Sequence, residues 1–277
     1  MEKFRNKFEK ILEFIDRLTG DNVSVYAAQA SFFLIISAIP LLMLIFTIIK
    51  LFINIDLRSI LHVINAFAPA EISNLITTIL NELFNKTASI PVISITAIST
   101  LWLASKGIMA LYMGLNNVYH VPMRNYIYSR LISVVYTLAL VATLILTILF
   151  FAFGNKFEIF IASHSIILSN IVQFILRGRI IFFMAYLTLL FALFYKFLPK
   201  KETSFKKQLP GAAFAAAGWM IFSFIYSIYI NNFSNYSYFY GSLAAIVFLM
   251  LWLYFCMNIF LYGAQINKML ENGFFKK

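Results

Sequence analysis

The sequence predicts an all-α protein: a polytopic membrane bundle of six transmembrane helices, with an N-terminal amphipathic helix and a surface helix in the first outer loop. Of 277 residues, 62% are hydrophobic and only 12% are charged, whereas soluble domains have about 45–50% apolar and about 25% charged residues. The mean hydropathy is +0.85. The apolar residues gather in stretches of the roughly 20 residues that a helix needs to cross a ~30 Å hydrocarbon core.

The elements follow in chain order. Residues 1–20 combine many charges with apolar residues at helical spacing, which indicates an amphipathic helix on the membrane surface; the alternative is a solvated start to the first span. Those apolar residues are Phe4, Phe8, Ile11, Ile15 and Leu18. Six long apolar stretches come next, at about 24–53, 90–118, 130–153, 173–196, 210–231 and 242–267. We expect a cytoplasmic helix over 1–20, a six-helix domain over 21–270 and a tail over 271–277.

The connection 54–89 is expected to lie outside the membrane and to contain a surface helix. Its apolar residues fall on one helical face, namely Ile72, Leu75, Ile76, Ile79, Leu80 and Leu83. Lysine and arginine concentrate in 1–20, 196–207 and 268–277, together with Arg124 and Arg130 between the second and third spans. The positive-inside bias therefore predicts both termini in the cytoplasm.

The net charge of +11 is interpreted as a topology signal and as an attraction to anionic lipid. Membrane lipids are therefore the expected partners, and nucleic acid is not. Cys256 is the one cysteine of the sequence, which excludes an intrachain disulfide and a thiol-metal cluster. No cofactor or metal is expected, and a homo-oligomer is compatible with the sequence.

Lys106 is a cation inside an apolar span. All eleven acidic residues lie outside the spans, so no carboxylate is expected at its depth, where an unpaired cation costs roughly 2.5 kcal/mol or more. Ser99, Lys106 and Asn117 are separated by 7 and 11 residues and share one helix face, with Trp102 beside them. We expect this face to meet an anion, such as a phosphate, a carboxylate or a lipid headgroup. The alternative is that Lys106 binds helix carbonyls or extends to the inner interface.

Other polar residues occur within the spans. Pro40 predicts a kink or a break in the first span, which either lines a cavity or serves packing. Side chains that can hydrogen-bond between helices are Gln29, Ser31, Ser37, Tyr226, Tyr229, Asn258 and Gln265. The hypothetical substrate-binding set is Lys106, Ser99, Trp102, Asn117, Gln29, Ser37, Pro40 and Gln265.

Two further groups of residues suggest structural roles. The small residues Gly211, Ala215 and Gly218, with Ala212 and Ala216, predict a face for close helix packing. Arg177 and Arg179 lie near the outer end of the fourth span and are expected to anchor lipid headgroups.

Several blocks of sequence stand in a specific order: "YAAQASFFLIISAIPLL", "LWLASKGIMALYMGLNNVYHV", "YKFLP", "LPGAAFAAAGW", "YINNFSNYSYFYGSLAAIVFLMLWLY" and "LYGAQIN". Over about residues 20–270 they resemble the YihY/virulence factor BrkB family of bacterial inner-membrane proteins. The resemblance implies a six-helix protein of the cytoplasmic membrane, in a family associated with export or flipping of lipid-linked material. Some members also carry a ribonuclease label.

One position departs from the family pattern. Where the family usually has Gly-Ala-Glu near the end of the last span, this chain has Gly263, Ala264 and Gln265. An amide does not titrate, so proton coupling through a glutamate is not available at this position. A structural hydrogen bond would survive the exchange.

These observations favour a transporter or flippase of an anionic or lipid-linked substrate, with a cavity that contains Lys106. The alternative is a non-transporting membrane scaffold that organises lipids or partner proteins. An enzyme, including a ribonuclease, is disfavoured because the spans contain no carboxylate or metal-ligand cluster. His62, His120 and His164 are expected to be isolated loop or interface residues. No Gly-rich ATP-binding motif occurs, so transport would be secondary, passive or driven by a partner.

Overall fold

A computed structural model describes residues 21–52, 61, 77–78, 81, 90–162, 179–199, 201, 203–232 and 242–273. The long helices within these ranges are α2 (Val23–Phe52), α5 (Ile90–Tyr119), α6 (Tyr126–Ala162), α8 (Arg179–Phe197), α9 (Phe205–Asn232) and α11 (Ser242–Glu271). The all-α membrane bundle is therefore confirmed. The predicted helix over 1–20 and the apolar positions of the predicted outer-loop helix lie outside the described residues.

Within the described residues, five stretches are long and apolar enough to cross a membrane by length and composition. They are Ile98–Tyr119, Tyr126–Ile145, Ile180–Phe197, Phe205–Ile230 and Ile246–Glu271. Val23–Ala38 in α2 is a shorter apolar stretch. Only 17% of the Phe205–Ile230 stretch is buried inside the protein, so most of its apolar surface faces outward, as expected for a helix in contact with lipid.

Pro40 does not break the first helix. α2 runs from Val23 to Phe52 as one helix with Pro40 inside it, so of the two expected outcomes, a kink or a break, the break does not occur. A proline removes one backbone hydrogen bond, and membrane helices tolerate this loss where neighbouring helices and hydroxyl groups surround them.

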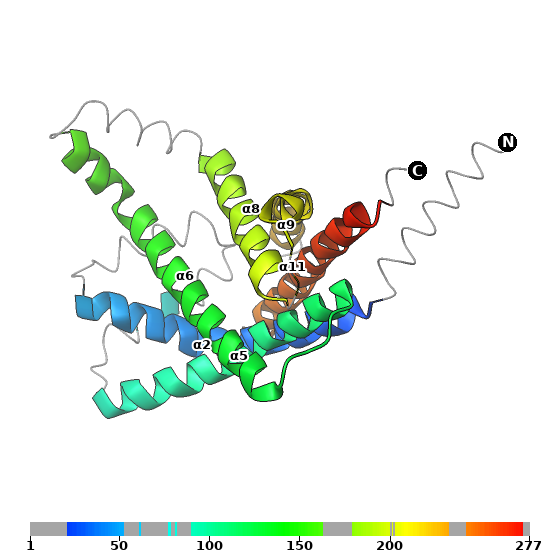
Figure 1. Ribbon diagram of the computed structural model, residues 1–277. Helices are drawn as coiled ribbons and strands as arrows, with labels where there is room; N and C mark the ends of the chain where they lie inside the picture. The colour runs from blue at the N-terminus through cyan, green and yellow to red at the C-terminus, as the bar shows by residue number, and fades with distance from the viewer. Residues whose placement is uncertain are drawn as a thin grey trace.

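The core forms where α2, α5, α9 and α11 meet. α2 packs along α5, while α11 packs on α9 and also contacts α2 and α5. α8 lies on α9, and α6 contacts mainly α5. Figure 1 shows α6 crossing the pair of α2 and α5 and then pointing away from α8. Large side chains buried at the centre include Tyr112, Leu115, Tyr195 and Leu261.

The predicted small-residue face is confirmed. Gly211, Ala212, Ala215 and Ala216 are buried, and α9 crosses α11 closely there. A Cβ atom at Gly211 would overlap the carbonyl oxygen of Gly263 and the side chain of Asn267. Glycine is required at this crossing because the two backbones are in contact.

The connection between α5 and α6 differs from a simple hairpin. After the positive φ of His120 (53°), residues 121–125 carry no regular structure. The backbone N–H of Arg124 reaches the Tyr112 hydroxyl at 3.3 Å, so this segment runs back along α5. α6 therefore begins beside the middle of α5 instead of at its end, and it begins earlier than the predicted third span.

Candidate functional site

Lys106 lies at the interface of α5 and α2. Its side chain is half-buried, and its ammonium nitrogen lies 5.2 Å from the centre of the Phe33 ring on α2. The neighbouring Gly107 lies at a close approach of the two helices, since a Cβ atom there would meet the Leu34 side chain. Lys106 is thus held beside a tight helix crossing, about 20 Å along the axis from Tyr119 at 1.5 Å per residue.

The Phe33 ring offsets only part of the cost of this cation. Among the described residues, no carboxylate forms an ion pair with Lys106; the pairs found there involve other cations. A cation–π contact contributes about 0.5–2 kcal/mol, whereas a lysine at mid-bilayer costs about 2.5–3.5 kcal/mol on insertion scales. An anion that reached Lys106 would therefore find an attractive and incompletely compensated charge.

Trp102, one turn before Lys106 on α5, contacts a second cation. The Arg130 guanidinium carbon lies 4.0 Å from the centre of the Trp102 ring, and Arg130 Nη2 donates to the Trp102 carbonyl oxygen at 2.8 Å. Arg130 is only 6% exposed. The sequence placed Arg130 at the start of the third span, among the cytoplasmic charges. The structure places it in the second turn of α6, and the segment before α6, which runs back along α5, brings it to Trp102.

The other residues of the hypothetical substrate-binding set lie in different environments. Ser99 is on an exposed part of α5, whereas Gln29 and Pro40 are half-buried on α2. Ser37 is buried, and its hydroxyl donates to the Leu34 carbonyl at 3.0 Å within its own helix. Of the residues predicted to bond between helices, Ser31 and Asn258 also bond within their helices, while Tyr226 donates to the Phe248 carbonyl across α9 and α11.

The two arginines expected to anchor headgroups are not placed. Arg177 lies outside the described residues, and so does the side chain of Arg179, whose backbone begins α8.

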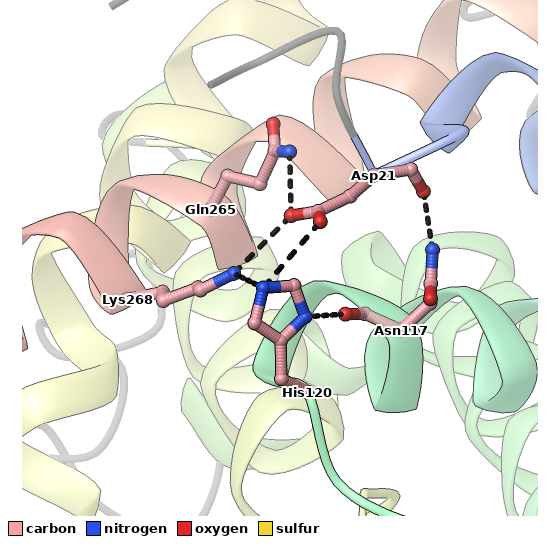
Figure 2. Close-up of polar contacts among 5 residues, drawn as sticks. All are labelled: Asp21, Asn117, His120, Gln265 and Lys268. Carbon is pink, nitrogen blue, oxygen red and sulfur yellow. Dashed lines mark hydrogen bonds and ion pairs between the residues drawn. The ribbon is translucent and has the colours of Figure 1, made fainter.

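Asn117 and Gln265 meet at Asp21 (Figure 2). Asn117 Nδ2 donates to the Asp21 carbonyl oxygen at 2.6 Å, and Gln265 Nε2 donates to Asp21 Oδ2 at 3.2 Å. Lys268 Nζ forms an ion pair with the same oxygen at 3.3 Å. We call Asp21, Asn117, His120, Gln265 and Lys268 the Asp21 cluster. It joins the start of α2 to the ends of α5 and α11.

His120 makes three polar contacts in the Asp21 cluster. Its Nδ1 lies 2.8 Å from the Asn117 carbonyl oxygen. Its Nε2 lies 2.9 Å from Lys268 Nζ and 3.8 Å from Asp21 Oδ1. The expectation that His120 is isolated is wrong.

A second polar network fixes the same end of the bundle. The Tyr119 hydroxyl donates to Gln208 Oε1 at 2.7 Å, and Asn267 Nδ2 donates to the Gln208 carbonyl at 3.0 Å. Asn267 Oδ1 accepts the backbone N–H of Gly211 at 2.7 Å. These buried groups connect α5, α9 and α11, and each satisfies a polar atom that would be costly to leave unpaired.

Sequence reasoning missed Asp21 and Arg130. Asp21 lies just before the first helical residue, which is a position typical of helix-start acids, but its contact with Gln265 spans 244 residues and has no local signal. Across the described ranges, no group of three or more His, Cys, Asp or Glu side chains is arranged to hold a metal ion.

Comparison with known proteins identifies relatives along nearly the whole chain. The putative ribonuclease-like protein YfkH of Bacillus subtilis is 30% identical over 264 residues, which cover 94% of each chain. A UPF0761 membrane protein of Vibrio campbellii is 26% identical, over 91% of this chain and 79% of the relative. Another of Alteromonas mediterranea is 24% identical, over 95% and 88%. No solved structure matches the chain.

The family comparison agrees with the resemblance noted in the sequence. The family described as Virulence factor BrkB matches residues 14–276, a range that includes every long helix of the bundle. This multi-pass helical membrane protein therefore belongs to the virulence factor BrkB family.

Proposed function

We propose that this membrane protein transports or flips an anionic, lipid-linked substrate and that Lys106 binds the negative charge as it passes. The main support is the environment of Lys106 within an apolar helix. Its ammonium contacts the Phe33 ring and forms no ion pair among the described residues. Methionine or leucine would pack at this position without the cost of a charge. A cation retained at this depth is best explained by an anion that visits it.

The second candidate from sequence, a non-transporting scaffold, requires no charge at this position. The name of the Bacillus subtilis relative suggests a third, a nuclease. Metal-dependent phosphodiester hydrolysis needs a metal-ligand cluster at one site, and the described residues bring no such group together. They therefore give a metal-dependent nuclease no support.

The test is lipid movement in proteoliposomes. Purified protein is reconstituted into vesicles that contain fluorescent phosphatidylglycerol, and the loss of the outer-leaflet signal after a membrane-impermeant reductant reports flipping. We expect wild type to exceed protein-free vesicles. Lys106→Met should reduce the rate by about tenfold or more, as for loss of a charge-assisted contact, and Lys106→Arg should keep most of it.

Lys206→Met is the matched control, because Lys206 is an exposed cation in the first turn of α9. Its rate should equal that of wild type. A Lys106→Met protein that flips lipid at the wild-type rate would remove Lys106 from the mechanism. A wild-type protein no faster than empty vesicles would favour the scaffold.

A further inference from the structure

Arg130 is a buried guanidinium whose hydrogen-bonding capacity is mostly unused. It lies in the second turn of α6 and is 6% exposed. Guanidinium has five N–H donors and no acceptor. One donor is used at the Trp102 carbonyl, whereas Nε and Nη1 have no hydrogen-bond partner in the part of the chain that the structure describes.

The contact with the Trp102 ring does not satisfy the unpaired N–H groups of Arg130. The indole covers a face of the guanidinium at 4.0 Å, but N–H groups point outward in the guanidinium plane, away from a stacked ring. A buried charge that lacks its partner destabilises a protein by about 3–5 kcal/mol. A ligand with oxygen atoms at the guanidinium edge would remove this cost.

We infer that Arg130 and Trp102 form a binding site for the phosphate group of an anionic membrane lipid or lipid-linked substrate. The planar fork of arginine matches two oxygens of a phosphate. Trp102 lies about 25 Å along α5 from Tyr119 at 1.5 Å per residue and is exposed on the outside of the bundle, so the site lies far from the Tyr119 end of α5 on a surface that lipid can reach. A phosphate that carries acyl chains fits both conditions.

The position of this site relates it to Lys106. Trp102 and Lys106 are four residues apart and therefore lie on adjacent turns of one face of α5. Trp102, the residue that contacts Arg130, is therefore one helical turn from Lys106. The inference deepens the proposed function and rests on it for the role of the lipid as substrate, but binding itself is independent of transport.

Binding requires a local opening. Nε and Nη1 are closed off in this structure, whereas 53% of the Trp102 surface is exposed. The guanidinium therefore lies close to an exposed part of the bundle at the Trp102 ring. The ligand would approach from this side once the guanidinium edge opens.

The experiment measures lipid retention without transport. The full chain is placed in phosphatidylcholine nanodiscs with a rising fraction of phosphatidylglycerol, and bound lipid is counted by native mass spectrometry. Arg130→Met should weaken phosphatidylglycerol binding by about tenfold or more, since hydrogen bonds to charged groups contribute about 1.5–3 kcal/mol. Arg124→Met is the matched control, because Arg124 also stacks on a ring, Tyr128, at 4.3 Å but is less buried.

Two further variants keep the result interpretable. Arg130→Lys retains the charge without the fork, so it should fold even if Arg130→Met does not, and it should bind several-fold more weakly than wild type. Lys106→Met should retain binding at Arg130 even where flipping is lost, which separates failure of this site from failure of the proposed function.

A titration with inorganic phosphate distinguishes the source of the anion. Competition by millimolar phosphate would support a site for the phosphate group alone, and no competition would support a site that also needs the acyl chains. Unchanged phosphatidylglycerol binding in folded Arg130→Met, or an equal loss in Arg124→Met, would overturn the inference.

Discussion

Gln265 donates its side-chain N–H to Asp21 Oδ2 at 3.2 Å and so ties α11 to the segment that leads into α2, which begins two residues later at Val23. Gln265 is 1% exposed, which makes this a contact of the bundle interior. A glutamine fits here because its amide can donate to a carboxylate, whereas a glutamate could only accept when ionised. The departure from the Gly-Ala-Glu pattern of the family is therefore matched to an acidic partner.

Gln265→Glu should destabilise the protein at neutral pH. The substitution sets two carboxylates against each other and removes the donor, for an expected loss of about 1–3 kcal/mol. Thermal unfolding in detergent should show a fall of about 2–4 °C per kcal/mol for a protein of this size. Combining it with Asp21→Asn should restore much of the loss. An equal midpoint for wild type and Gln265→Glu would show that this hydrogen bond is not maintained in solution.

Asp21→Ala should be more damaging than removal of a more peripheral ion pair. It leaves Gln265 and Lys268 without their shared acceptor. Loss of such a partner lowers the free energy of unfolding by about 1–3 kcal/mol. Lys201→Met breaks the pair with Glu271 at 2.5 Å, which is more exposed, and should cost under about 1 kcal/mol. Equal thermal midpoints for the two variants would contradict the central role of Asp21.

Gly211→Ala should disrupt the crossing of α9 and α11. Its Cβ would meet the Gly263 carbonyl, a backbone atom that cannot move aside, so we expect a loss of about 3 kcal/mol or more from overpacking. Gly218→Ala is the control on the same helix, since its Cβ would approach only the Ile259 side chain and alanine favours helix by about 1 kcal/mol. The comparison is read from the yield of monodisperse protein and its thermal midpoint.

Asn267→Ala should also lower stability. The substitution leaves the buried Gly211 N–H and two oxygens of Gln208 without Asn267, and each buried unsatisfied group costs about 1–3 kcal/mol. Asn272→Ala, at an exposed position after α11, should change the midpoint little. Urea or heat unfolding of the two variants tests this network. Equal midpoints for Asn267→Ala and Asn272→Ala would show that Asn267 does not stabilise it.

The sequence predicts local features of this fold well and distant contacts poorly. The long helices follow from apolar stretches, and the Gly211 face follows from small residues at helical spacing. Lys106 and Asn117 both contact the α2 segment, through Phe33 and Asp21, as their spacing on one helix face suggests. The sequence did not predict that Asn117 and Gln265 of the hypothetical substrate-binding set contact Asp21 instead of lying beside Lys106. Polar residues occur along several helices, and only tertiary packing decides which of them become partners.

Arg130 shows why the remainder could not be predicted. A basic residue between two apolar stretches is normally assigned to a connection, and nothing local indicates that residues 121–125 run back along α5. That path depends on the turn at His120 and on the contact of Arg124 with Tyr112, which form only when α5 is in place.

The length of α6 exceeds the thickness of a membrane interior. This helix has 37 residues, a length of about 55 Å at 1.5 Å per residue, and among the described elements it packs mainly on α5. Because a hydrocarbon core is ~30 Å thick, a helix of this length must tilt in the membrane or extend beyond it.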